Sequence, residues 1–235
     1  MAEINRLLQM LSDTDLAGLN EHFTTVELRQ GDVLAEPGDD IRRIYFPHSG
    51  IVSFMVALIN GPLVQTGMVG RDGVIGASQA IDGTKSINKI VVQVPGNASM
   101  IDRVPLRHLL ASGSAVKNVF ASHAQFFVAD VQQTAACNAC HSAQARMARW
   151  LLRMRDLVGD DLPITHDYLA AMIGVRRSTV SPLASAMQEM GVISYVRGRL
   201  HVGNVESLKE HSCECHETVR ENYQALLGAP WPIAN

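Results

Sequence analysis

The feature that most constrains the fold is the stretch 162–202, in which two helical patterns separated by one glycine precede a hairpin pattern. Apolar residues recur at helical spacing in two runs, Leu169, Ala170, Ile173 and Val175, then Val180, Leu183, Met187 and Met190. Thr165 is a suitable N-cap for the first helix, and Gly174 can end it in the left-handed conformation. Gly191 ends the second helix, and two strand patterns then meet at Arg197-Gly198. This order predicts a winged helix-turn-helix.

Arginine and hydroxyl side chains gather where the second helix of this motif would enter a DNA groove. Arginine binds guanine bidentately, and hydroxyls bind bases or phosphates. The candidates are Arg176, Arg177, Ser178, Thr179 and Ser181 at the helix start and Arg197 and Arg199 in the hairpin. The alternative is a helical hairpin with a solvated basic face, but the glycine turn, the cluster and the basic hairpin together favour DNA binding. Pro182 predicts that the helix starts near Ser178 or that its first part is bent.

Composition indicates a globular chain whose positive charge is local. Of 235 residues, 47% are hydrophobic and 18% are charged, and the formal net charge is −3. The window 146–199 nevertheless carries eight arginines against five acidic residues. The N-terminus lacks a secretory signal pattern, and no apolar run has membrane length. We therefore expect a cytoplasmic protein with reduced cysteines and no membrane partner. No set of side chains suggests catalysis or a catalytic metal, which predicts a non-enzyme.

The N-terminal half shows short alternating runs broken by glycines, which predict an antiparallel barrel or jelly roll. The predicted strands are 26–28, 33–35, 43–46, 51–58, 63–69, 89–94 and 98–102, preceded by short helices over 4–11 and 12–22 and followed by one over 105–111. Residues 114–139 form the longest helical stretch. Its candidate seam is Val116, Phe120, His123, Phe127, Asp130, Thr134 and Cys137, which fits either a coiled coil or a helix buried within its own chain. Ser142 caps the next helix, 159–163 is a linker, and Asn204 caps one last helix through Leu227.

This arrangement resembles the Crp/Fnr superfamily of bacterial transcription regulators over almost the whole chain. The most specific segments are IRRIYFPHSGIVSF, GRDGVIGA, ITHDYLAAMIGVRRSTV and MGVISYVRGRL. The resemblance implies an α+β fold with a cyclic-nucleotide-binding-like β-roll at 1–113, a dimerisation helix and hinge at 114–141 and a winged helix-turn-helix domain at 142–235. It also implies a homodimer on a near-palindromic double-stranded operator, RNA polymerase as a partner and a small-molecule effector in the β-roll.

The resemblance also assigns roles within the DNA-binding motif. Arg177, Ser178 and Ser181 would face bases, while Thr165, Arg176 and Thr179 would contact phosphates. Ser178 replaces a glutamate of the cyclic-AMP-responsive members, and Pro182 replaces their second arginine. A different operator sequence is expected.

The predicted effector pocket departs from the nucleotide-binding pattern. Its residues are Gly73, Val74, Ile75, Gly76 and Ala77, with Ile87 and Asn88. In cyclic-nucleotide domains a glutamate holds the ribose and an arginine neutralises the phosphate. Here Ala77 stands in place of the glutamate and Ile87-Asn88 in place of the arginine pair. We therefore expect an effector other than cyclic AMP; no cofactor is predicted.

Two cysteine motifs provide the alternative functions. Cys137, Cys140 and His141 match the C-x-x-C-H pattern of covalent haem attachment, which would make the protein an electron carrier. Cys213 and Cys215 could serve metal or redox sensing, although on a continuous helix their side chains diverge by roughly 200°. On such a helix Cys215 would share a face with His211 instead. The iron–sulfur regulators of the superfamily carry an N-terminal cysteine cluster, whereas this chain has no cysteine before Cys137.

Overall fold

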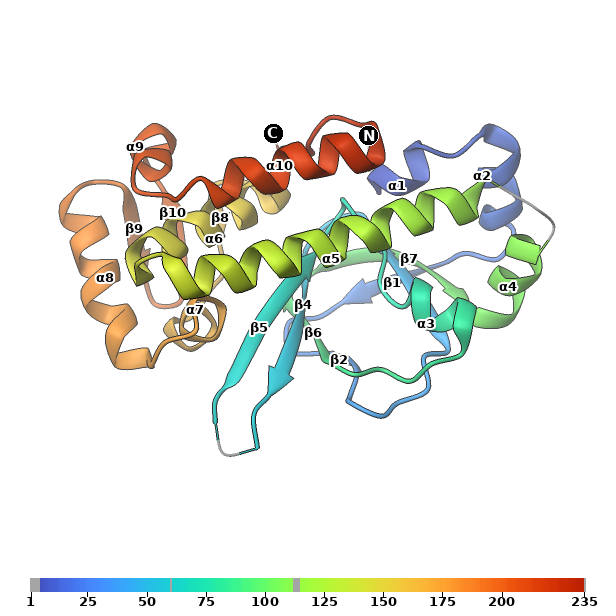
Figure 1. Ribbon diagram of the computed structural model, residues 1–235, viewed down its shortest axis with the longest axis horizontal. Coiled ribbons are helices and arrows are strands. Elements are labelled where there is room, and N and C mark those ends of the chain that lie inside the picture. The colour runs from blue at the N-terminus through green and yellow to red at the C-terminus, as the bar shows by residue number, and fades with distance from the viewer. Residues whose placement is uncertain (1–4, 60, 112–114, 235) are drawn as a thin grey trace.

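The computed structural model describes residues 5–59, 61–111 and 115–234. Figure 1 shows one long helix, α5 (Val116–Cys140), running through the middle of the molecule. The β-strands of the N-terminal half lie on one side of α5, and α10 (Cys215–Leu227) runs along it on another side. The remaining C-terminal elements gather at the end of α5 where that helix stops.

All seven strand segments predicted for the N-terminal half are strands in the part of the chain that the structure describes. They are β1 (Thr24–Leu28), β2 (Val33–Ala35), β3 (Arg43–Pro47), β4 (Ile51–Ala57), β5 (Leu63–Val69), β6 (Lys89–Val94) and β7 (Gly96–Asp102). They form two antiparallel sheets with the strand orders β1-β7-β3 and β2-β6-β4-β5. Side chains such as Leu28, Val52 and Ile90 fill the space between the sheets. Successive side chains of a strand point to opposite faces, so alternate residues reach this core.

Four short helices accompany this β-roll. They are α1 (Arg6–Gln9), α2 (Asp13–Asn20), α3 (Ala77–Asp82) and α4 (Arg103–Ala111). Ser12 caps α2 as predicted, since its side chain accepts a hydrogen bond from the Asp15 N–H. The predicted first helix included Ile4, which lies outside the described residues, and α3 was not predicted.

The predicted seam of α5 is covered by the same chain. Its members are buried, except that Phe127 is half-buried and its neighbour Phe126 is buried instead. Phe127 packs against Phe54 of the β-roll with ring centroids 4.7 Å apart. Phe126 meets Tyr223 of α10 edge to face at 5.1 Å. This stripe is therefore an intrachain core rather than a coiled-coil seam. The predicted starting residue of the helix, Ser114, lies outside the described residues.

The C-terminal part contains the predicted helix-turn-helix and hairpin. Its elements are α6 (Ala143–Val158), β8 (Asp161–Leu162), α7 (His166–Ile173), α8 (Arg177–Glu189), β9 (Ile193–Val196), β10 (Arg199–Val202) and α9 (Val205–Glu210). Gly174 ends α7 in the left-handed region with φ 65°. Arg197 and Gly198 have φ values of 48° and 80°, as a tight two-residue hairpin turn requires. α8 begins at Arg177, one residue from the predicted start, with Pro182 inside it.

Two predictions for this part are wrong. Residues 161 and 162 do not form a linker, because they pair with β10 as strand β8. The last helix is not continuous to Leu227, because residues 211–214 separate α9 from α10. The Asn204 cap is confirmed, since its side chain accepts from the Ser207 N–H at 3.0 Å. The break at 211–214 changes where the two C-terminal cysteines point.

Candidate nucleic-acid interface

The start of α8 presents the predicted contact residues to solvent. Arg176, Arg177, Ser178, Thr179 and Ser181 are all exposed. The opposite face of the helix carries Val180, Ala184 and Met187, which are buried in the core of the C-terminal domain. The amphipathic pattern of α8 thus fixes its rotation, so that its polar first turn faces outward.

Side-chain contacts hold this turn against the start of α7. Thr165 caps α7 by accepting from the Tyr168 N–H at 3.3 Å. Arg177 Nη1 lies 3.5 Å from Asp167 Oδ2, and both side chains are about two-thirds exposed. Ser181 Oγ and His166 Nδ1 are 3.1 Å apart. An exposed ion pair of this kind is weak, so Arg177 is free to exchange Asp167 for a stronger acceptor.

The hairpin is tied to the same two helices. The Tyr195 N–H of β9 donates to Gln188 Oε1 of α8 at 2.8 Å, and the Tyr195 ring stacks on His166 with centroids 4.5 Å apart. Arg197 and Arg199 are exposed. His166 and Tyr195 were missed by the sequence reasoning because each residue alone carries no motif. Burial, opposed by a hydrogen bond from the His166 backbone, raises the pKa of Tyr195.

A buried ionic network joins this C-terminal domain to the β-roll. Arg153 of α6 pairs with Asp72, in the turn after β5, and both side chains are almost fully buried. Arg149, one turn earlier, donates to Asp130 Oδ1 at 3.0 Å and to Thr134 Oγ1 at 3.1 Å on α5. Burial raises the pKa of Asp130. Polar residues of the α5 stripe are thus partners for α6 within the chain.

The C-terminal tail closes the same network. Asp156 of α6 accepts from Trp231 Nε1 at 2.7 Å and lies 2.9 Å from His216 Nε2 of α10. The Arg153 guanidinium also lies over the Trp231 ring, 4.6 Å from its centroid. These contacts hold the C-terminal tail against α6, the helix that precedes the helix-turn-helix.

Comparison with known proteins agrees with this architecture. Residues 145–211 match the family model of the Crp-like helix-turn-helix domain. FixK2 of Bradyrhizobium japonicum has a TM-score of 0.70 at 15% identity, covering 81% of this chain and 98% of that one. The c-di-GMP responsive global regulator CLP of Xanthomonas campestris has a TM-score of 0.68 at 14% identity, covering 82% and 100%. Residues 145–211 thus carry a Crp-like helix-turn-helix domain, and the described chain shares the fold of these regulators.

A CRP/FNR-family transcriptional regulator of Thermus thermophilus is similar as well. Its TM-score is 0.65 at 23% identity, and the match covers 80% of this chain and 98% of the Thermus chain. No curated protein matches the sequence significantly. Within residues 5–59, 61–111 and 115–234, every helix is too short or too polar to span a bilayer.

The residues of the predicted effector pocket are mostly packed against the rest of the chain. A Cβ atom on Gly73 would overlap His123 Nε2 of α5 and lie 2.9 Å from Val69 Cγ1. The Ile75 N–H donates to the Tyr45 carbonyl at 2.9 Å, so it is not free for a phosphate. Val74, Ile75 and Ala77 are buried, whereas Ile87 is 81% exposed. The Gly73–Ala77 loop is therefore closely packed at Gly73, and its Ile75 donor is already engaged.

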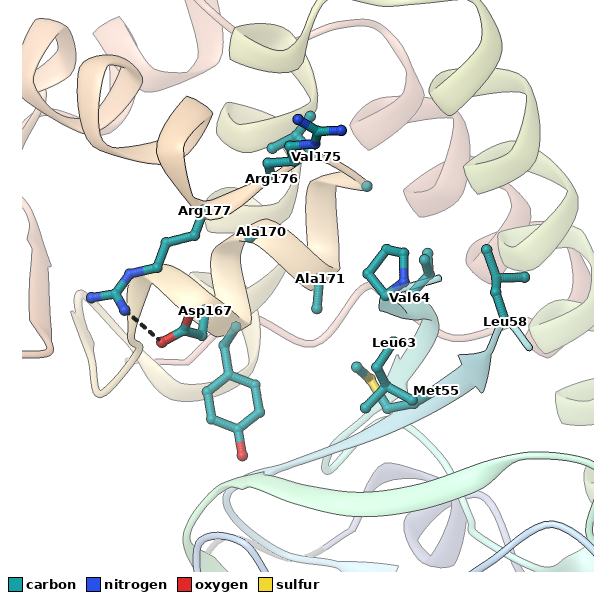
Figure 2. Close-up of a pocket in the computed structure, with 13 residues that line it drawn as sticks. Met55, Leu58, Leu63, Val64, Asp167, Ala170, Ala171, Val175, Arg176 and Arg177 are labelled. Atoms are coloured by element: carbon teal, nitrogen blue, oxygen red, sulfur yellow. Dashed lines mark ion pairs between the residues drawn. The ribbon is translucent and has the colours of Figure 1, made fainter. Parts of the chain in front are cut away.

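A different cavity lies between the β-roll and the helix-turn-helix. It has a volume of about 910 Å³ and is bounded by the β4–β5 hairpin, which contributes Met55, Leu63 and Val64. Figure 2 shows these side chains facing Ala171 of α7, with Arg176 and Arg177 at the α8 side. The turn of the helix-turn-helix thus lies beside a hairpin of the β-roll.

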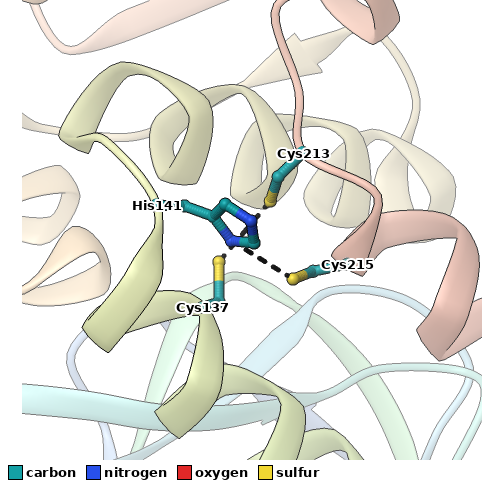
Figure 3. A group of neighbouring side chains, drawn as sticks. All are labelled: Cys137, His141, Cys213 and Cys215. Atoms are coloured by element: carbon teal, nitrogen blue, oxygen red, sulfur yellow. Dashed lines mark hydrogen bonds between the residues drawn. The ribbon is translucent and has the colours of Figure 1, made fainter.

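The four cysteines separate into one exposed thiol and a cluster of three. Cys140 is exposed, whereas Cys137 is buried one helical turn away. Cys137 Sγ lies 3.5 Å from Cys213 Sγ, and Cys215 Sγ lies 3.5 Å from His141 Nδ1 (Figure 3). The hydrogen bond from Cys137 lowers the pKa of Cys213 to about 5. His211 Nδ1 lies 2.8 Å from the Ser207 carbonyl, and the break at 211–214 removes the continuous helix on which His211 and Cys215 could share a face. The haem interpretation also lacks support, because Cys137 is covered by the C-terminal segment.

Proposed function

We propose that the protein is a transcription regulator that binds a near-palindromic DNA operator as a homodimer and acts in the cytoplasm without catalysis. The observation that carries this proposal is the exposed first turn of α8, bracketed by α7 and the β9–β10 hairpin within the Crp-like helix-turn-helix segment. In such motifs the first residues of the second helix read base edges in the major groove.

Each predicted contact residue has a role in this proposal. Arg177, Ser178 and Ser181 read bases from α8. Arg176, Thr179 and Thr165 bind the adjoining phosphates, and Arg197 and Arg199 bind the backbone from the hairpin. The exposure of the α8 and hairpin residues supports these assignments, since a buried arginine could not reach a phosphate. Thr165 is only half-exposed, and its hydroxyl already accepts one backbone hydrogen bond.

The proposed dimer uses a face of α5 that the chain itself leaves exposed. The residues of this face are Ala121, Gln125, Val128, Gln132, Ala135 and Ala139, all exposed. They follow one another by four and three positions, which is the spacing of a coiled-coil seam. These side chains are uncharged and three of them are alanines, which allows two helices to approach closely. A two-fold axis along this exposed face would place the α8 helices of the two subunits so that they could enter successive major grooves.

Regulation in this proposal does not use cyclic AMP. The Gly73–Ala77 loop has its Ile75 donor engaged, and Gly73 abuts His123 where a ligand would need space. A small-molecule effector other than a cyclic nucleotide and contact with RNA polymerase complete the proposal. A saturable calorimetric isotherm with cyclic AMP would contradict it.

Selection of binding sequences from a random DNA pool tests the proposal. We expect one enriched palindrome with half-sites about one helical turn apart. Arg177→Ala should weaken operator binding by about 1–3 kcal/mol and relax specificity at one base pair, because a base contact is lost. Arg197→Ala should weaken all sequences alike and reduce the salt dependence, because a phosphate contact is lost.

Arg29→Ala is the matched control, since the Arg29 side chain is 75% exposed on the β-roll and far from α8 in the sequence. This variant removes the same charge and should bind like the wild type. Recovery of no palindrome by the folded wild type, with and without cell extract as a source of effector, would contradict the proposal.

A further inference from the structure

Three thiols and one imidazole converge where α5 ends. Cys137 and His141 come from the end of α5 and its C-cap. Cys213 comes from the break between α9 and α10, and Cys215 is the first residue of α10. Their four ligand atoms all lie within 4.8 Å of one another. Figure 3 shows the side chains from the two segments pointing toward a common centre. The break at 211–214 makes this possible, because on a continuous helix Cys213 and Cys215 would point apart.

The spacing of these atoms suits a single ion. A tetrahedral zinc ion with Zn–S bonds of about 2.3 Å places its sulfur ligands about 3.8 Å apart. The Cys137–Cys213 and Cys215–His141 separations are both 3.5 Å, close to this edge length. An iron–sulfur cluster distributes its ligands over separate iron atoms, so it needs wider spacing. Three thiolates and an imidazole are also a standard structural zinc set.

Neighbouring groups orient the ligands as they do in metal sites. His141 Nε2 lies 3.3 Å from Glu214 Oε1, which leaves Nδ1 directed at the cysteines. A carboxylate on the far nitrogen of a ligating histidine fixes its tautomer and raises its basicity. Gln133 Nε2 donates to Cys215 Sγ at 3.0 Å, and such donors stabilise the charge of a thiolate.

We propose that Cys137, His141, Cys213 and Cys215 bind one zinc ion, which clamps the start of α10 to the end of α5. Binding releases to solvent the protons of those cysteines that are still thiols, because each cysteine ligand must be a thiolate and His141 binds as a neutral imidazole. The clamp stands at the hinge into α6, where Arg146 Nη1 already donates to the Asn138 and His141 carbonyls at 2.9 and 3.1 Å. Zinc occupancy therefore fixes the junction between the central helix and the DNA-binding domain. This site does not depend on the proposed function.

Metal analysis of the full chain, purified under reducing conditions and incubated with zinc, tests the site. We expect one zinc per chain after desalting, and loss of that zinc in Cys213→Ser and Cys215→Ser. Cys140→Ser is the matched control, because Cys140 is exposed and is not a member of the group, so it should retain one zinc. Cobalt loaded in place of zinc should give a thiolate-to-metal charge-transfer band in the wild type and in Cys140→Ser. Cys213→Ser and Cys215→Ser should lack this band.

A second measurement covers the case in which a ligand variant fails to fold. Chelation of wild-type protein should lower the unfolding temperature, and added zinc should restore it, because an ion that binds only the folded state stabilises it. Cys140→Ser should behave in the same way. Failure of the wild type to retain zinc would overturn the proposal. So would iron with acid-labile sulfide, or a Cys137–Cys213 disulfide that persists through reduction and zinc loading.

Discussion

His123 couples the pH of the solution to folding. Burial lowers the pKa of this histidine from 6.5 to about 4, while neighbouring Asp72 raises it and Arg153 lowers it. Between these two values the unfolded chain binds a proton that the folded chain excludes, so stability is lost as the pH falls through this range. We expect the free energy of unfolding to fall by up to about 3 kcal/mol through this residue. Urea unfolding at several pH values would measure it.

His123→Gln is the comparison, because it removes the titration while retaining a polar side chain. The difference in unfolding free energy between the wild type and this variant should change between pH 6.5 and pH 4, whatever its value at neutral pH. A difference that stays constant over that range would show that His123 titrates normally.

The exposed face of α5 that includes Val128 is the proposed dimer interface, and one substitution in this helix tests it. Val128 is 54% exposed at the centre of this face, whereas other faces of α5 pack against the β-roll and α10. Val128→Glu should convert a dimer into monomers, because two carboxylates would meet across the two-fold axis. Sedimentation equilibrium would measure the change in mass.

Val104→Glu is the control for this change, since Val104 is 61% exposed on α4 and lies outside that face of α5. It should leave the oligomeric state unaltered. A Val128→Glu protein that sediments like the wild type would assign the dimer interface to another surface.

At the scale of the whole molecule, the Asp72–Arg153 pair holds the β-roll and the DNA-binding domain in one arrangement. Arg153→Leu leaves the Asp72 carboxylate buried without its cation and removes the contact with Trp231. The expected loss of stability is about 3–5 kcal/mol, measured by chemical unfolding. Arg29→Leu, which breaks an exposed pair with Glu27, should cost less than about 1 kcal/mol.

Adding Asp72→Asn to Arg153→Leu should recover part of the loss, because the uncompensated charge is then removed. If Arg153→Leu and Arg29→Leu lowered the free energy of unfolding equally, the buried pair would not join the two parts of the chain.

Local sequence patterns determined most of the elements of this protein. The strands, the length of α5, the Gly174 turn and the caps at Ser12, Thr165, Ser142 and Asn204 follow from side-chain period and backbone preference, which act over a few residues. The exposed contact face of α8 follows in the same way, since its buried residues fix its rotation.

Only the tertiary structure decided which partners those elements meet. The apolar spacing of the buried face of α5 fits both a coiled coil and a core within the chain. The packing of Phe126 against Tyr223 shows that it is a core within the chain. Strand β8 was missed because two residues carry no periodic signal, and it exists through pairing with β10. Cys137 and Cys213 are 76 positions apart, and no local preference reports a contact that depends on how α10 packs along α5.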